Sequence, residues 1–182
     1  MRQSAYLARL GVAAVGAPGL ALLSELQAAH LLAVPFENLS VIRQEPIVLE
    51  EERLVDKIVA RRRGGFCYEL NGSFAWLLRQ LGFSVTLISA RVYSTGRQEF
   101  GPEFDHLALL VQLDEHYLVD VGFGDSVRQP IALPAGEATD VSGHYRIRRV
   151  TSEADTYHLE RAGDGGWTAQ YAFTSTPHQL AE

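Results

Sequence analysis

The single cysteine of the chain, Cys67, stands where local sequence favours a reactive thiol. It follows three arginines, Arg61–Arg63, and the pair Gly64-Gly65, at the predicted start of a helix. A helix N-terminus carries a partial positive charge and unpaired N–H groups, and both stabilise a thiolate, the nucleophilic form. The two glycines allow another backbone or a substrate to approach closely. This position favours Cys67 as a nucleophile, although a lone cysteine is more often a buried and inert residue.

A thiolate nucleophile needs a base, and the base needs a group that orients it. Of the six histidines, His106 opens a strongly apolar segment at residues 107–111, whereas His30 lies on the apolar face of a predicted helix. Asp120 ends the next predicted strand, where burial of a carboxylate is costly unless it has a partner. We therefore expect His106 to be the base and Asp120 to orient it. The alternative is that Asp120 only caps the loop Gly122–Gly124.

The turn between these two strands decides whether the side chains can meet. Paired residues in an antiparallel hairpin have a constant sum of residue numbers, so His106 and Asp120 share a face only if that sum is even. A two-residue turn at Asp114-Glu115 gives an odd sum and places them on opposite faces. A three-residue turn or a bulge gives an even sum. A Cys-His-Asp triad therefore requires a three-residue turn or a bulge.

The pattern of apolar residues changes near Gly82. Before it, helical spacing predicts helices near residues 6–10, from Pro18 in a first turn to a stop at Pro35, over 49–63, and from Cys67 to Gly82. After it, alternation and short apolar runs predict strands at 84–93, 107–113, 117–121, 145–150, 157–161 and 167–173. Helices followed by antiparallel strands are typical of an α+β fold or of two segregated domains.

Composition limits the class of protein. The 182 residues include 16 basic and 22 acidic side chains, with a formal net charge of -6 and 47% hydrophobic residues, which is ordinary for a globular chain. The acidic balance argues against a nucleic-acid surface, and the single lysine, Lys57, argues against a lysine-rich membrane patch. One cysteine excludes an internal disulfide, and Cys67, His106 and Asp120 form a poor zinc set. No apolar run reaches the ~20 residues of a membrane span and no secretory leader is recognisable, so we expect a cytoplasmic protein.

Four segments resemble, in the same order, motifs of the arylamine N-acetyltransferase family. Val34–Leu39 resembles the first motif, and residues 63–71, Arg-Gly-Gly-Phe-Cys-Tyr-Glu-Leu-Asn, resemble the active-cysteine motif. His106–Val111 and Val119–Gly124 look like the histidine and aspartate motifs, and Tyr6–Leu10 fits the family's opening. Four ordered motifs are far more specific than a lone cysteine.

The resemblance implies a fold and a set of catalytic residues. The implied fold is a helical bundle over residues 1–82 followed by an antiparallel β-barrel over 83–182, with a core similar to that of papain-like cysteine enzymes. Cys67 would be the nucleophile, His106 the base and Asp120 the orienting group. The family also has a third, lid domain, which helps to form the coenzyme A cleft and which we expect to be absent here. Surface left uncovered by the lid would favour self-association.

The resemblance also implies an activity and its substrates. An acetyl group would pass from acetyl-CoA to an arylamine, hydrazine or arylhydroxylamine through an acetyl-cysteine, without a metal. Phe36, Phe123 and Val92 would line the acceptor pocket, with plain core packing as the alternative for the two phenylalanines. Gly122 and Gly124 would lie near the acetyl-CoA.

Two other function classes fit the same residues. A papain-like or transglutaminase-like thiol hydrolase would use the same cysteine, histidine and aspartate, although the four ordered motifs favour the acetyltransferase. A non-catalytic or weakly active binding module is the other class, and it would leave Cys67 with ordinary thiol reactivity. In each case we expect Arg63 to hold its loop through ion pairs or hydrogen bonds rather than to touch a substrate.

Overall fold

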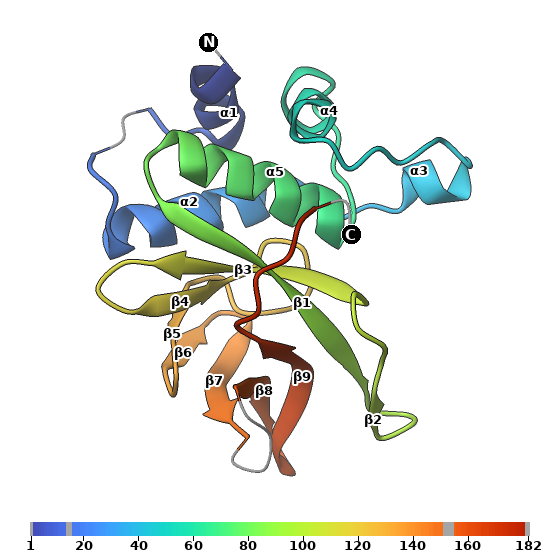
Figure 1. The fold of residues 1–182 in the computed structure, drawn as a ribbon, viewed down its shortest axis with the longest axis vertical. Helices are drawn as coiled ribbons and strands as arrows, with labels where there is room; N and C mark the ends of the chain where they lie inside the picture. The colour runs from blue at the N-terminus through green and yellow to red at the C-terminus, as the bar shows by residue number, and fades with distance from the viewer. Residues whose placement is uncertain (1, 14–15, 151–154, 181–182) are drawn as a thin grey trace.

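Helices and strands are segregated along the chain, as the sequence predicts. The computed structural model describes residues 2–13, 16–150 and 155–180. A layer of helices ends at Gln80, and a large antiparallel sheet begins at Ser84 (Figure 1). The α+β class is therefore confirmed. No helix in the part of the chain that the structure describes is long and apolar enough to cross a lipid bilayer.

The helical layer contains five α-helices and one π-helical turn among the described residues. These are α1 (Arg2–Leu10), α2 (Leu20–Ala33), α3 (Leu39–Ile42), α4 (Glu51–Val55), the π-helix η1 (Asp56–Ala60) and α5 (Cys67–Gln80).

Two of the predicted helix boundaries are wrong. Pro18 lies outside α2, because Gly19 is the N-cap and has an extended backbone. The helix expected over residues 49–63 begins at Glu51 and ends in η1. Arg62 then takes a left-handed conformation with φ 51°, which ends the helix before Arg63.

The sheet contains the six predicted strands together with three short ones. They are β1 (Ser84–Ser94), β2 (Glu99–Phe100), β3 (His106–Gln112), β4 (His116–Val119), β5 (Ile131–Ala132), β6 (Glu137–Asp140), β7 (Gly143–Arg149), β8 (Thr156–Gly163) and β9 (Gly166–Thr174). Of the strands that sequence analysis missed, β2 and β5 have only two residues and are too short to show a period of two, whereas β6 has four.

The strands form a nearly closed barrel. Their order is β5-β4-β3-β1-β9-β8-β7-β6, and β2 pairs with β1 beside this path. The two ends of the order meet, because β5 contacts both β6 and β7 and the Gly136 N–H donates to the carbonyl of Ala132 at 2.8 Å. Figure 1 shows the helices together on one side of the strands that form the barrel. The expected sequence of a helical part and a β-barrel is thus confirmed, while its division into two domains stays a prediction.

Central strands β1 and β3 are apolar on both faces, since each face packs against a different core. Leu87 and Leu109 point toward the helices, where Leu70 and Phe74 of α5 are fully buried. Ala90 and other alternate residues of both strands point into the barrel. Truncating a buried phenylalanine such as Phe74 to alanine typically costs ~3–5 kcal/mol, so the helix–sheet contact is a major source of stability. Burial of both faces explains why residues 107–111 are uniformly apolar.

The turn between β3 and β4 has three residues, Leu113–Glu115. Leu109 pairs with Val119 and Gln112 with His116, so the paired residue numbers have an even sum. The three-residue turn required above is therefore confirmed. His106 and Asp120 consequently share the face of the sheet that points into the barrel, in a diagonal relationship.

Candidate active site

Cys67 is the first residue of α5. Phe66 is the N-cap, with an extended backbone at φ -90° and ψ -179°. Its N–H donates to the Glu69 carboxylate at 3.3 Å, and its carbonyl accepts the first intrahelical bonds, from the Glu69 and Leu70 N–H groups. The N–H groups of the first helical residues are therefore left at the helix start. The predicted position of Cys67 is confirmed, and its side chain is partly exposed.

A buried ion pair stabilises the start of this helix. Lys57 of η1 lies 2.7 Å from a carboxylate oxygen of Glu69, and both side chains are 6% exposed. Lys57 also donates to the Ser40 hydroxyl at 3.1 Å. The carboxylate that caps α5 is thus fixed by a cation from a different element. Breaking such a buried pair on one side leaves an uncompensated charge.

The loop that leads into Cys67 is tied to the segment containing Phe36. Arg63 lies 2.8 Å from Glu37 and 3.2 Å from Glu45, so the expected ion-pair role of Arg63 is confirmed. Phe36 and Gly65 form a parallel β-bridge. A β-carbon on Gly64 would lie 1.9 Å from the Pro35 carbonyl oxygen, so only glycine fits there. The two motifs that are separate in sequence therefore form one local structure.

His106 and Asp120 meet inside the barrel. The imidazole Nε2 lies 2.7 Å from Asp120 Oδ2, and each residue is 3% exposed. Cys67 is near enough to the imidazole to help raise the pKa of His106. Since Asp120 occupies Nε2, Nδ1 is the nitrogen available to the thiol. The expected contact of His106 with Asp120 is present, and the catalytic roles of Cys67, His106 and Asp120 stay predictions.

Charge and hydrogen bonding set the protonation of this pair. Burial acts to lower the pKa of His106, but the Asp120 charge, its hydrogen bond and the contact with Cys67 together raise that pKa to about 10. Burial acts to raise the pKa of Asp120. His106 and the hydrogen bonds from Asn71 and Gly122 outweigh it and hold the pKa of the carboxyl below its usual value. The pair therefore favours an imidazolium beside a carboxylate.

The Asp120 carboxylate receives four hydrogen bonds from four different parts of the chain. Asn71 Nδ2 and the Gly122 N–H donate to Oδ1 at 2.9 and 2.8 Å. His106 Nε2 and the Tyr171 hydroxyl donate to Oδ2 at 2.7 and 3.1 Å. Asp120 therefore pairs with His106 and also caps the loop after it, so the alternative of a loop cap alone does not describe its contacts.

Sequence analysis missed the other partners of this carboxylate. Asn71 lies one helical turn after Cys67 and also donates to the Leu107 carbonyl at 2.7 Å, which ties α5 to β3. Its position four residues after the nucleophile, on the same helix face, is a signal that could have identified it. Tyr171 of β9 is fully buried, and no local pattern links it to Asp120.

The three residues predicted to line the acceptor pocket differ in how directly they contact His106, Asp120 and Tyr171. Phe123 contacts both His106 and Tyr171, with ring centroids 5.2 and 5.1 Å apart. Val92 of β1 pairs directly with Tyr171. Phe36 is 47% exposed, so core packing does not explain it. Phe123 packs directly against the His106 ring, and the binding roles of all three residues stay predictions.

The two glycines expected near acetyl-CoA differ in their surroundings. A β-carbon on Gly122 would lie 2.7 Å from the α-carbon of Cys67, and the Gly122 N–H is already bonded to Asp120. Close packing thus explains why Gly122 has no side chain. Gly124 has φ +94° and open space where a β-carbon would stand. Of the two, Gly124 is the one beside which a ligand has room.

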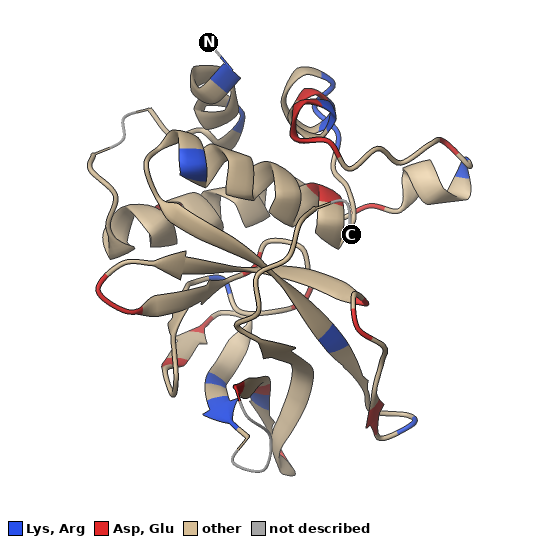
Figure 2. Ribbon diagram, in the orientation of Figure 1, with Lys and Arg blue, Asp and Glu red and all other residues tan. Residues whose placement is uncertain are grey.

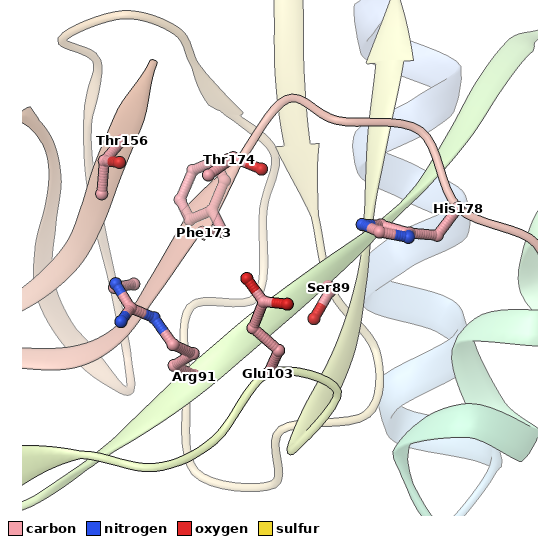
Figure 3. A pocket seen from close by; sticks show the side chains of 8 residues that line it. Ser89, Arg91, Glu103, Thr156, Phe173, Thr174 and His178 are labelled. Carbon is pink, nitrogen blue, oxygen red and sulfur yellow. The ribbon is translucent and has the colours of Figure 1, made fainter. Parts of the chain in front are cut away.

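A separate cavity of about 240 Å³ lies on the opposite face of β1 from Ala90, the residue paired with His106 (Figure 3). Ser89, Arg91 and Glu103 line it, together with His178 from the segment after β9. The Ser89 hydroxyl accepts a hydrogen bond from the Phe104 N–H at 2.7 Å. The cavity therefore borders the segment that leads into His106 but contains none of the three clustered residues.

Among the residues that the structure describes, no group of three or more His, Cys, Asp or Glu side chains is arranged to hold a metal ion.

Comparison with known proteins identifies the family. Residues 19–182 match the model of the N-acetyltransferase family. The chain belongs to this family. The family resemblance inferred from the four motifs is thereby confirmed.

Curated relatives from distant organisms are similar over most of the chain. The pineal gland isozyme of arylamine N-acetyltransferase from Gallus gallus is 38% identical over 166 residues, which is 90% of this chain and 56% of the relative. An arylamine N-acetyltransferase from Mycolicibacterium smegmatis is 38% identical over 178 residues, which is 94% of this chain and 64% of the relative. The chain thus spans less than two thirds of the length of these two relatives.

Solved structures of the family share the fold. An arylamine N-acetyltransferase from Bacillus cereus superposes with a TM-score of 0.91 at 32% identity, covering 99% of this chain and 72% of that one. The Salmonella typhimurium enzyme has a TM-score of 0.91 at 35% identity, covering 99% and 65%. The Bacillus cereus protein is described as having a Cys-His-Glu catalytic triad. In this chain the carboxylate beside His106 belongs to Asp120.

Proposed function

We propose that this chain carries the reactive centre of an arylamine N-acetyltransferase, with Cys67 as nucleophile, His106 as base and Asp120 as orienting group. The observation that carries the proposal is the buried imidazole held between the Asp120 carboxylate at 2.7 Å and the Cys67 thiol at a helix start. Relatives named arylamine N-acetyltransferase, 38% identical to this chain, support the reaction and its substrates.

The first half-reaction forms an acetyl-cysteine. His106 holds the proton taken from the Cys67 thiol as an imidazolium, and the thiolate sulfur of Cys67 attacks the thioester carbonyl carbon of acetyl-CoA. The bond between that carbon and the coenzyme A sulfur breaks, and coenzyme A leaves with the proton from the imidazolium. N–H groups at the start of α5 are positioned to stabilise the oxyanion. Asp120 keeps Nε2 protonated, so that Nδ1 is the nitrogen that faces the thiol.

The second half-reaction transfers the acetyl group to the acceptor. The amine nitrogen attacks the acetyl carbon, His106 accepts a proton from that nitrogen, and the carbon–sulfur bond to Cys67 breaks. Cys67 leaves as a thiolate beside the imidazolium of His106, which restores the starting state. Phe123 lies beside His106 and would stack on an aromatic amine. Phe36 and Val92 would extend this surface, and the open side of Gly124 would admit the pantetheine arm of acetyl-CoA.

Intact-mass measurement after brief exposure to acetyl-CoA tests the proposal. We expect a gain of one acetyl group on Cys67, lost again when an arylamine is added and an arylamide appears. Cys67→Ala is the control and should gain nothing. Absence of the adduct in a chain whose Cys67 is alkylated rapidly by iodoacetamide would refute the choice of acyl donor. Hydrolysis of a peptide ester under those conditions would instead support the thiol-hydrolase alternative.

A further inference from the structure

A surface groove separates the first helix from the π-helical turn. The groove has a volume of about 390 Å³ and lies between α1 and the α4–η1 segment. Its apolar lining comes from alanine and valine side chains on both elements, namely Ala5, Ala8, Val55, Val59 and Ala60. A volume of this size matches the lower range of small-molecule pockets. None of the residues proposed above for catalysis lines it.

Two arginines from different elements line this groove. Arg9 of α1 and Arg62, just after η1, both line it. They are close enough for Arg62 to lower the pKa of Arg9, second only to burial. Arg9 Nε is shielded from solvent and has no hydrogen-bond partner among the described residues. A buried donor without a partner is rare in a folded protein, and two cations side by side attract an anion.

The acidic residues of the groove already have partners. Glu52 pairs with Arg2 at 2.9 Å, and Asp56 pairs with Arg61 at 3.3 Å. In Figure 2 the only charged residues of α1 are basic, whereas basic and acidic residues are mixed along the α4–η1 segment. No ion pair between Arg62 and a carboxylate is found in the part of the chain that the structure describes. The groove thus combines an apolar floor with a pair of unneutralised guanidinium groups.

From these observations we infer that the groove between α1 and η1 binds an organic monoanion with an apolar body, of which a medium-chain carboxylate is the simplest example. The carboxylate would accept hydrogen bonds from Arg9 and Arg62, whose planar guanidinium groups suit bidentate contacts. The hydrocarbon body would lie on the alanines and valines. This site is independent of the proposed acetyl transfer, because it shares no residue with the triad or its pocket.

Calorimetric titration with decanoate, kept below its micelle-forming concentration, tests the inference. We expect one decanoate to bind per chain. Decanol has the same chain without the charge and should bind ~10-fold more weakly or worse, because the charge-assisted hydrogen bonds are lost. Decyltrimethylammonium, with the opposite charge, should not bind. Equal affinity for decanoate and decanol, or no binding of decanoate, would overturn the proposal.

Variants locate the site. Arg9→Gln and Arg62→Gln should each weaken decanoate binding ~10-fold or more, whereas Arg2→Gln, at the same groove but paired with Glu52, should change it less than about twofold. Because Arg9 is partly buried, its variant also needs an unchanged thermal unfolding curve. Ala8→Trp, at an exposed position, fills the groove without removing a charge and should abolish binding. Wild-type affinity in Ala8→Trp would place the ligand elsewhere and refute the inference.

Discussion

Replacing Asp120 by asparagine should trap His106 in the wrong tautomer. The position of the new amide is set by its neighbours, because the N–H of Gly122 and the side-chain amide of Asn71 both donate to Oδ1 of Asp120. An asparagine must therefore place its carbonyl oxygen there and its NH₂ group toward His106 Nε2. A donor facing Nε2 requires that nitrogen to be unprotonated. The ring proton then moves to Nδ1, which faces Cys67 and can no longer accept the thiol proton.

The expected loss follows from this change of tautomer. In serine hydrolases the equivalent change leaves the geometry intact and lowers turnover by ~10⁴, so we expect a loss of ~10³–10⁴-fold in the reactivity of Cys67, or about 4–5 kcal/mol. Alkylation by iodoacetamide, followed by intact mass, measures this without depending on an acyl donor. Acetyl-cysteine formation from acetyl-CoA should fall in parallel.

The same variant should reverse the pH dependence of stability. In the wild type the pKa of His106 is raised from 6.5 to about 10, so its contribution is fully present below pH 6.5 and is lost as the pH rises through about 10. Without the Asp120 charge, burial dominates and lowers the pKa of His106, so that stability is lost instead as the pH falls below 6.5. Urea unfolding midpoints across this range, compared between the two proteins, give the difference.

Asp120→Glu is the matched control, because it keeps the negative charge. It adds one methylene to a fully packed site, at a cost of ~1–3 kcal/mol, yet should retain more Cys67 reactivity than Asp120→Asn. If Asp120→Asn reacts at the wild-type rate with the wild-type pH profile, then Asp120 acts only as a loop cap and the tautomer argument is wrong.

Three further substitutions test the structures around the triad. Tyr171→Phe removes one hydrogen bond to the triad carboxylate and should cost ~1.5–3 kcal/mol in urea unfolding, with a smaller loss of thiol reactivity than Asp120→Asn; an unchanged unfolding midpoint would contradict this. Gly122→Ala puts a β-carbon 2.7 Å from the α-carbon of Cys67 and should slow alkylation at least ~10-fold, which a wild-type rate would exclude. Lys57→Met leaves the Glu69 charge buried and unpaired and should destabilise the chain by ~3–5 kcal/mol, an effect that Lys57→Met/Glu69→Gln should partly relieve.

The sequence predicts the cluster of Cys67, His106 and Asp120 more fully than it predicts the rest of the fold. His106 and Asp120 lie on adjacent strands joined by a short turn, so the parity of one hairpin decides whether they meet. The structure has the even register that the triad requires. Cys67 joins them from a helix, and arginine, glycine and cysteine at that point mark a helix start. Each of these signals is local in the chain and could be evaluated without knowing the strand order.

Short elements and helix ends could not be predicted in this way. Strands of two residues such as β5 carry no period, and they exist only because the barrel supplies a neighbour. The end of η1 depends on Arg62, whose left-handed backbone is uncommon for a residue with a side chain. Arg63 beyond it is held by Glu37 and Glu45, both distant in sequence. Tertiary ion pairs, rather than local propensity, set this boundary.

Tyr171 illustrates a limit of prediction from sequence. The sequence indicates that the buried carboxylate of Asp120 has hydrogen-bond partners, but it does not identify Tyr171 as one of them. Burial of Asp120 is unfavourable unless most of its lone pairs are satisfied, and this requirement is visible in the sequence as an acid after an apolar strand. Tyr171 reaches Asp120 only because β9 lies beside β1, β1 pairs with β3, and β3 pairs with β4, which ends one residue before Asp120. Fifty-one residues separate the two side chains in the chain. A partner that depends on three successive strand pairings becomes visible only once the order of the sheet is known.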